Sequence, residues 1–253
     1  GALFFKLTSD DYRIFTSQLE DLRAVLTGSV YQECESTFWY GIQPKLNSLG
    51  IKLGTKRFDK SGFYIFDEEN SKTFIRCGSY KNRPFQCDNL HLDIWIKGRN
   101  FLRDSGSYKY NTTQEYTEFF TGNEGHNVPS VNGKNQMERG VRFVWSRWVK
   151  NSEATISVKE NRLEFIGVIN TSHAKYKRSI TKEENINRWV IVDECTCRDF
   201  DKFLQYWHVP IELDDLINLK SVDSENNSLS IKKEQKWFSQ YYGVLEESIR
   251  YTI

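Results

Sequence analysis

Apolar residues near the start of the chain recur at steps of three and four. They are Tyr12, Phe15, Leu19, Leu22 and Leu26. This spacing predicts a helix with one apolar face. An apolar stripe of this kind has to be covered, either by the rest of this chain or by a preceding part of a longer protein.

Capping residues at both ends agree with this helix. Thr8 or Ser9 can cap its start, and Asp10 and Asp11 fall in the first turn, where negative charge is favourable. Gly28 suits the C-terminal stop.

The pattern changes to strands after about residue 58. Leu90, Leu92, Ile94 and Ile96 alternate with polar or aromatic residues at a period of two. Other short stretches bounded by turn residues are strand candidates: 63–66, 73–76, 101–103, 141–149, 154–158, 162–169, 174–180, 188–193, 203–209 and 229–233. Short strands at this density predict an all-β fold, an antiparallel two-sheet β-sandwich over 58–253. Residues 1–57 are then a helical segment that precedes it.

Composition narrows the range of partners. The net charge of +1 gives no bulk electrostatic reason to expect nucleic acid or an anionic membrane surface. There is no apolar run of about 18 residues, so we expect no membrane span. Five cysteines are an odd and small number for a disulfide framework. We expect free, partly buried thiols, which favour a reducing compartment.

The most informative part of the sequence runs from Arg83 to Met137. It contains three motifs in order: RPFQCDNLHLD at 83–93, an Asp-x-Gly-x-Tyr turn at 104–108, and GHNV at 125–128 with a following Asn-Gly at 132–133. Three more stretches follow downstream: RWVIVDE at 188–194, Trp-His at 207–208 and WFSQYYG at 237–243.

This ordered set resembles the C-terminal half of heparinase II/III-like polysaccharide lyases. The resemblance implies an N-terminal α/α toroid and a C-terminal β-sandwich, with the active site between them. The first helix of this chain would then be the last toroid helix or the connection to the sandwich. The implied reaction is β-elimination next to a uronic acid in an acidic polysaccharide. The closing segment 237–243 resembles that of members encoded with surface-polysaccharide genes, which implies a role in bacterial surface-polysaccharide metabolism.

The same resemblance implies site residues. The Tyr acid/base and the Asn or His that neutralises the substrate carboxylate come from the toroid, whereas the sandwich supplies a His at the position of Gln86. A glutamine cannot act as a general base because it does not titrate near neutral pH, although it could still hydrogen-bond a substrate. In zinc-bearing members the metal ligands fall at the positions of Asp88, Asp104 and His126. The two carboxylates could equally cap turns.

The roles of several other side chains can be interpreted from the sequence. His126 follows Gly125 and titrates near neutral pH, so we predict that it is a site residue. Tyr108 could donate a proton to a leaving group or lie at a wet strand edge. Arg83 and Arg103 could bind substrate carboxylates or pair with surface acids.

Two further histidines carry weaker predictions. His173 and Tyr176 belong to a His-x-x-Tyr-x-Arg stretch that, by the resemblance, lies near the active-site face and would bind substrate. His91 alternates away from Leu90 and Leu92, which favours packing or solvent exposure over function.

The leading function is a polysaccharide lyase acting on a uronate-containing glycan, with this fragment alone inactive. A second possibility is a non-catalytic glycan-binding or scaffolding protein of surface-polysaccharide assembly, because Gln86 replaces the family's histidine. A third is a plain carbohydrate-binding sandwich whose aromatic residues form the binding platform.

Overall fold

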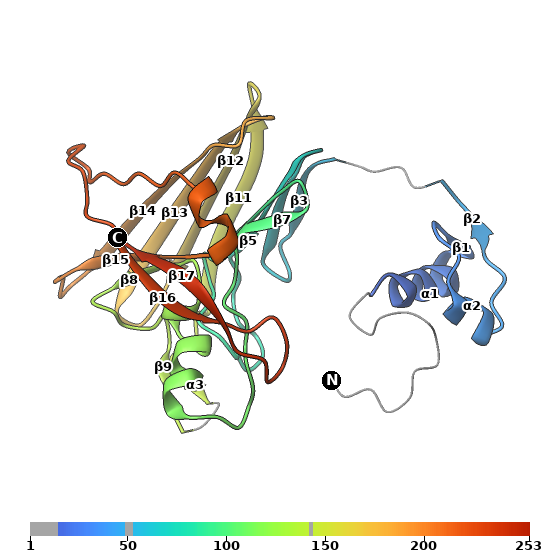
Figure 1. The fold of residues 1–253 in the computed structure, drawn as a ribbon, viewed down its shortest axis with the longest axis horizontal. Helices are drawn as coiled ribbons and strands as arrows, with labels where there is room; N and C mark the ends of the chain where they lie inside the picture. The colour runs from blue at the N-terminus through green and yellow to red at the C-terminus, as the bar shows by residue number, and fades with distance from the viewer. Residues whose placement is uncertain (1–14, 49–52, 142–143) are drawn as a thin grey trace. The chain divides into compact units, whose positions relative to one another are not determined.

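The computed structural model describes residues 15–48, 53–141 and 144–253. The chain forms two compact units, Gly1–Lys52 and Leu53–Ile253 (Figure 1). The first unit holds helices α1 (Thr16–Thr27) and α2 (Glu35–Trp39) and a parallel pair of short strands, β1 (Ser29–Val30) and β2 (Lys45–Leu46). The predicted caps at Thr8 to Asp11, and Tyr12, lie outside the described residues.

The first predicted helix is present as α1, and Gly28 ends it with a left-handed φ of 70°. The residues that α1 buries are Glu20 and Ala24. Glu20 accepts a hydrogen bond from the backbone N–H of Tyr31 at 2.7 Å. The apolar stripe is largely exposed: Leu19 is 63% exposed and Leu26 72%.

The second unit is built from three antiparallel sheets. The first has five strands in chain order, β3 (Gly54–Phe58), β4 (Phe63–Asp67), β5 (Ser71–Arg76), β6 (Leu92–Ile96) and β7 (Arg99–Leu102). The second has four long strands, β11 (Asn151–Lys159), β12 (Arg162–Asn170), β13 (Ala174–Glu183) and β14 (Trp189–Cys197). The third runs in the order β16 (Lys232–Phe238), β17 (Glu246–Thr252), β15 (Phe203–Val209) and β8 (Pro129–Val131).

Shorter elements complete this unit. They are the strand pair β9 (Glu138–Arg139) and β10 (Trp145–Ser146), the helix α3 (Gln114–Thr121), and the 3₁₀ turns η1 (Asn123–Gly125) and η2 (Ile211–Leu216). Helix α3 and turn η1 lead directly into β8, and this connection carries His126.

The sheet β11–β14 packs against the other two. On the side of the five-stranded sheet, the rings of Tyr64 and Phe165 lie 5.3 Å apart. Trp189 donates to the Thr73 hydroxyl at 2.8 Å. On the side of the third sheet, the Arg178 guanidinium lies 4.9 Å from the centre of the Trp207 ring. The apolar core lies between these layers, so the predicted all-β sandwich is confirmed.

The five-stranded and third sheets meet at one end. The backbone N–H of Arg103, just after β7, donates to the carbonyl of His208 in β15 at 3.1 Å. This junction lies beside the connection from η1 to β8, and it brings the three predicted motifs together.

Several predicted bounds differ from the structure. Strand β3 begins at Gly54, so residues 54–57 belong to the five-stranded sheet although the predicted boundary follows residue 57. Within 141–149, where one strand was expected, the described residues form only the two-residue strand β10. The strand expected at 229–233 begins at Lys232 and runs on to Phe238. Helix α3 and strand β17 were not predicted.

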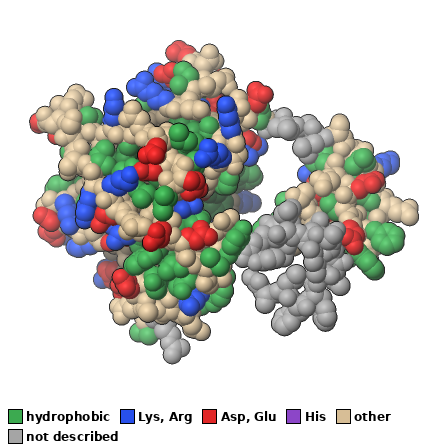
Figure 2. Space-filling view, viewed as in Figure 1, with side chains coloured by type: hydrophobic (Ala, Val, Ile, Leu, Met, Phe, Trp, Pro, Cys, Tyr) green, Lys and Arg blue, Asp and Glu red, His purple; other side chains and the backbone are tan. Residues whose placement is uncertain are grey.

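The surface and the cysteines agree with the composition. Cys77, Cys87, Cys195 and Cys197 are free thiols, and the first two are buried. Basic and acidic side chains are interspersed on the face drawn in Figure 2. Among the described helices, none combines the length and apolarity needed to cross a bilayer.

Candidate functional site

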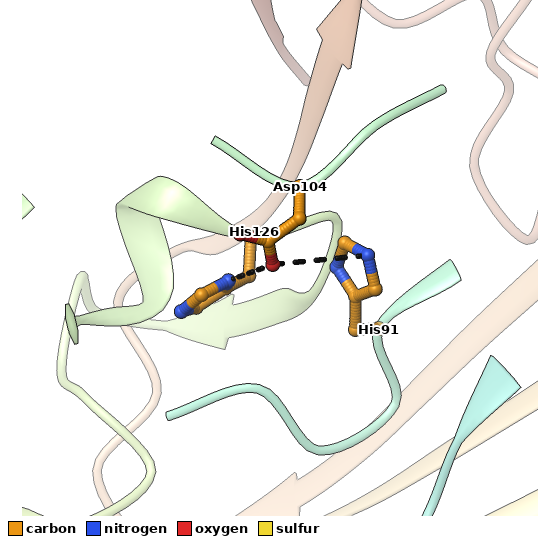
Figure 3. Close-up of side chains that lie close together, drawn as sticks. All are labelled: His91, Asp104 and His126. Carbon is orange, nitrogen blue, oxygen red and sulfur yellow. Dashed lines mark hydrogen bonds and ion pairs between the residues drawn. The ribbon is translucent and has the colours of Figure 1, made fainter. Parts of the chain in front are cut away.

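Three side chains from separate segments meet at the sheet junction. His91 precedes β6, Asp104 follows β7, and His126 follows η1 (Figure 3). Asp104 Oδ2 lies 2.6 Å from His126 Nδ1 and 3.9 Å from His91 Nε2. One ligand atom from each of the three lies within 4.8 Å of the others. We call these residues the His-Asp-His cluster.

Because the cluster is largely buried, its charged groups shift one another's pKa strongly. The side chain of His126 is fully buried and that of His91 is 6% exposed, whereas that of Asp104 is 34% exposed. Burial alone would raise the pKa of Asp104, but the charge and hydrogen bond of His126 outweigh it and hold this pKa well below its ordinary value. Burial would likewise lower the pKa of His126, yet Asp104 raises it above the ordinary value. Asp104 and His126 therefore form a buried ion pair.

His91 takes a different protonation state. Burial lowers its pKa to about 4, so the ring is neutral near pH 7. Its Nδ1 accepts the backbone N–H of Asn127 at 3.0 Å. A neutral imidazole that accepts at Nδ1 carries its proton on Nε2. His91 therefore presents an N–H to Asp104, and not a lone pair.

Asn127 organises this corner of the fold. Its side-chain amide donates to the carbonyls of Leu92 and Arg103, and its Oδ1 accepts the backbone N–H of His208 at 2.6 Å. Its own carbonyl accepts from Arg178. A buried side chain that can meet all these backbone groups fixes the three segments relative to one another. The His-Asn motif thus combines a site histidine with the residue that positions it.

Asp88, the third ligand expected from the resemblance, lies outside the group of three ligand atoms. Its Oδ1 accepts a hydrogen bond from the Tyr80 hydroxyl at 2.7 Å and lies 2.8 Å from Arg76 Nε. Its negative charge nevertheless contributes to raising the pKa of His126, so the two groups interact. The structure therefore brings Asp104 and His126 together and adds His91, while Asp88 pairs with Arg76.

Gln86 is joined to the cluster through a turn. Its Nε2 donates to the carbonyls of Phe120 at 3.2 Å and Gly106 at 3.4 Å. The N–H of Gly106 in turn donates to Asp104 Oδ1 at 2.7 Å. Gly106 has a φ of +91°, and a Cβ there would lie 2.1 Å from the carbonyl oxygen of Ser239. This explains the glycine of the Asp-x-Gly-x-Tyr turn.

Tyr108 follows this turn with a left-handed φ of 55°. Its ring packs against Tyr116 and Phe120, with centroids 5.2 and 5.8 Å away. Phe120 also contacts Gln86, whose Nε2 donates to its carbonyl, and the Tyr108 side chain remains partly exposed.

The predicted substrate-binding residues are dispersed. Arg83 is exposed and lines a cavity beside Gln86. Arg103 lies over the Phe238 ring at 3.4 Å and donates to the hydroxyl of buried Ser248. Tyr176 is fully buried, and its hydroxyl accepts the backbone N–H of Val131 and lies 3.2 Å from His173 Nε2. Of these residues, Arg83 is the one that the structure leaves open to a ligand next to Gln86.

These features define an antiparallel β-sandwich with a histidine–carboxylate cluster at one end. The sequence pattern of the C-terminal region of heparinase II/III-like proteins matches residues 51–250. This chain belongs to that family, the heparinase II/III-like C-terminal family.

Individual relatives agree with this assignment. Over 209 residues the chain is 24% identical to a heparin-sulfate lyase of Bacteroides stercoris, a match that covers 74% of this chain and 30% of that protein. A heparan sulfate lyase HepC from Pedobacter heparinus has the same fold, with a TM-score of 0.65 at 15% identity over 94% of this chain and 38% of that one. A crystal structure of heparinase III gives 0.62 at 17% identity, over 84% and 35%. The chain spans about a third of the length of these relatives.

Proposed function

We propose that this chain is the C-terminal part of a polysaccharide lyase that cleaves a uronic-acid-containing polysaccharide by β-elimination. The observation that carries the proposal is the His-Asp-His cluster linked through Gly106 to Gln86, in a chain of this family. A preceding α/α domain of the same protein would complete the active site. The exposed apolar stripe of α1 supports such a domain, because Leu19, Leu22 and Leu26 offer it a surface.

The reaction determines which chemical groups this chain and the preceding domain have to supply. The C5–H bond breaks, a C4–C5 double bond forms, the C4–O4 bond breaks, and the leaving oxygen takes a proton. The substrate carboxylate must be neutralised while negative charge develops beside it. Gln86 does not titrate near pH 7 and so cannot take the C5 proton. The base and the acid would therefore come from the preceding domain, and this chain alone would be inactive.

The proposed role of this chain is to bind and position substrate. The Gln86 amide holds the turn at Gly106 against the end of α3. Asp104 and His126 fix the neighbouring loops by a buried charged hydrogen bond. Together they would form a rigid floor for the glycan next to the partner domain.

Zinc is a proposed component of this floor, bound by Asp88, Asp104 and His126. Two features of the structure suit it. His126 Nδ1 and Asp104 Oδ2 face each other at 2.6 Å, so zinc would take the place of the proton that these two groups share. The contacts of Asp88 with Arg76 and Tyr80 both use Oδ1, the kind of support that ligating carboxylates usually have. Bound zinc would supply a fixed positive charge near the substrate and hold three loops together.

A non-catalytic glycan-binding protein is the second candidate function. It is favoured by the Gln86 amide, which is engaged with two backbone carbonyls at the position of the family's histidine. Under this alternative the cluster serves binding and structure alone.

The decisive experiment uses the full-length protein with a panel of uronate polymers. Absorbance of the unsaturated product reports β-elimination, and a parallel binding measurement reports recognition. We expect product from at least one acidic polymer, and none from this chain alone. Binding without product for every polymer would overturn the lyase proposal and favour the second candidate.

A further inference from the structure

A cavity beside Gln86 is lined by several positively charged side chains. It measures about 370 Å³ and is lined by residues of the β3–β4 turn, the end of β5 and the segment that leads to Gln86. The lining residues that matter here are Lys60, Arg76, Tyr80, Lys81 and Arg83. Four of them are cationic, and no carboxylate belongs to the lining. We call this the basic pocket.

The nearby acids leave most of this charge uncompensated. Asp88 pairs with Arg76 at 2.8 Å. Asp59, next to Lys60 in sequence, is held instead by Arg57 and the Tyr64 hydroxyl. Lys60, Lys81 and Arg83 are exposed, and none of them makes an ion pair or side-chain hydrogen bond to another described residue.

Tyr80, in the far wall of the pocket, is held by several hydrogen bonds. The Tyr80 hydroxyl lies 2.7 Å from Asp88 Oδ1 and 3.0 Å from the carbonyl oxygen of Gln86, which share its one proton. The backbone N–H of Tyr80 donates to the carbonyl of Val149. The segment that carries Lys81 and Arg83 is thus held at both of its ends, Tyr80 and Gln86. Cations held close together in a concave site attract anions, since their repulsion is relieved when an anion binds.

We infer that the basic pocket binds an anionic substituent of the polysaccharide, a sulfate ester or a uronate carboxylate, and so sets how acidic a glycan this protein accepts. Arg83 offers a planar guanidinium group that matches the oxygens of either anion, and Lys60 and Lys81 add point charges, whereas Arg76 is already paired with Asp88. The inference deepens the proposed function and rests on it only for the identity of the ligand. The pocket would lie along the same glycan whose reactive sugar is next to Gln86.

The test uses the full-length protein and two polymers with the same backbone, heparin and its unsulfated counterpart. The variant is Lys81→Ala with Arg83→Ala. The matched control is Lys175→Ala with Lys220→Ala, which removes the same charge from exposed positions outside the pocket. Binding to each immobilised polymer is measured at low and at physiological salt, and thermal unfolding checks that both variants fold.

We expect the pocket variant to bind about tenfold more weakly at low salt, since each lost charge-assisted contact contributes roughly threefold or more, and the control to stay within about twofold of the parent. Loss confined to heparin would assign the pocket to sulfate, and equal loss with both polymers would assign it to carboxylate. Parent-like binding by the pocket variant, or an equal loss with the control, would overturn the inference. If binding of single-stranded DNA fell by the same factor in the pocket variant, the pocket would be an unspecific anion-exchange surface, and the inference would be overturned as well.

Lyase turnover is recorded in parallel with binding. A parent protein that forms no product but binds heparin through the pocket would refute the proposed activity and leave the pocket standing. If the parent is active but the pocket variant binds as the parent does, the proposed activity stands and the inference about the pocket is refuted.

Discussion

Asp104 is the residue on which the other site contacts converge. It accepts hydrogen bonds from Gly106 and His126, and His91 directs an N–H towards it. The protonation states differ among its partners, because His126 is charged by its close contact with Asp104 whereas burial keeps His91 neutral. His91 is thus a neutral support beside the carboxylate, in contrast to His126, whose Nδ1 makes the charged hydrogen bond to Asp104; the Nε2 atoms of both rings are buried without a hydrogen-bond partner among the described residues.

This difference predicts the metal content of four variants of the full-length protein. His126→Ala, Asp104→Ala and Asp88→Asn should each lose bound zinc, because each removes a proposed ligand. His91→Gln should keep its zinc when the metal is in excess, because loss of a supporting contact weakens affinity only about 10- to 100-fold. Metal analysis after gel filtration gives the stoichiometry.

Other patterns of zinc content among these variants would lead to different assignments. Zinc retained by Asp88→Asn but lost by His91→Gln would assign the metal to the His-Asp-His cluster. Zinc content equal to that of the parent in His126→Ala would remove the metal site altogether.

Asp104 was predicted from the family resemblance and His126 also from its Gly-His-Asn turn, whereas the alternation of residues indicated only packing or solvent exposure for His91. The period-two pattern counted Leu90 as part of a strand, which put His91 on the opposite face. In the structure Leu90 has a left-handed φ of 66° and β6 begins at Leu92, so the alternation does not extend to His91. The ring is covered by the segment at Asn127, 36 residues away. Such a contact between distant segments leaves no local pattern to detect.

At the level of elements, α3 shows why a short helix is hard to find. Its eight residues include three aromatic ones, Tyr116, Phe119 and Phe120. Trp237 in β16 packs against both Tyr116 and Phe119, with ring centroids 4.8 and 5.2 Å away. A strand more than a hundred residues later therefore stabilises the helix, and helical propensity alone would be insufficient for a helix of this length.

The sheet β11–β14 was easier to predict because its long strands alternate cleanly, and one of its strands carries the support for the site. Arg178 in β13 is fully buried and bonds both oxygens of Asp193 in β14, at 2.8 and 2.7 Å. Its remaining Nη1 donates to the carbonyls of Leu90 and Asn127. One side chain thus connects the second sheet to the loops that hold His91 and His126.

Removing this guanidinium should destabilise the fold strongly. Arg178→Met would leave Asp193 buried without its cation, at a cost of about 3 to 5 kcal/mol in the free energy of unfolding. The control is Lys177→Met, which breaks the neighbouring exposed pair with Glu194 and should cost less than about 1 kcal/mol. Urea unfolding of both variants measures the difference, and equal losses would show that burial of the pair is not what matters.

For the molecule as a whole, the alternation of short strands was sufficient to predict the sandwich, whereas the charge balance inside it was not visible in the sequence. Burial lowers the pKa of His91 to about 4 and that of His208 to about 3. Burial raises the pKa of Asp93 to about 7. These groups lie near one end of the sandwich and respond to pH in opposite directions.

Their balance predicts how stability depends on pH in the zinc-free protein. Below about pH 6.5 the unfolded chain protonates both histidines while the folded protein does not, so the free energy of unfolding falls as the pH falls. Asp93 acts against this, because between about pH 7 and 4 the folded protein keeps a proton that the unfolded chain has lost. The two histidines together outweigh the single carboxyl of Asp93. Between about pH 6.5 and 5 the free energy of unfolding should therefore fall by an amount that approaches 1.4 kcal/mol per pH unit. Half-buried His173, whose pKa burial also lowers, adds in the same direction.

Asp93→Asn separates the two effects. Without the opposing carboxyl the slope should roughly double over the same pH range, and above about pH 7 the variant should be more stable than the parent because no buried charge remains at that position. Urea titrations in a chelating buffer at three pH values measure both slopes. A parent whose stability is constant or rises as the pH falls from about 6.5 to 5, or a variant with the parent's slope, would contradict this assignment of charges.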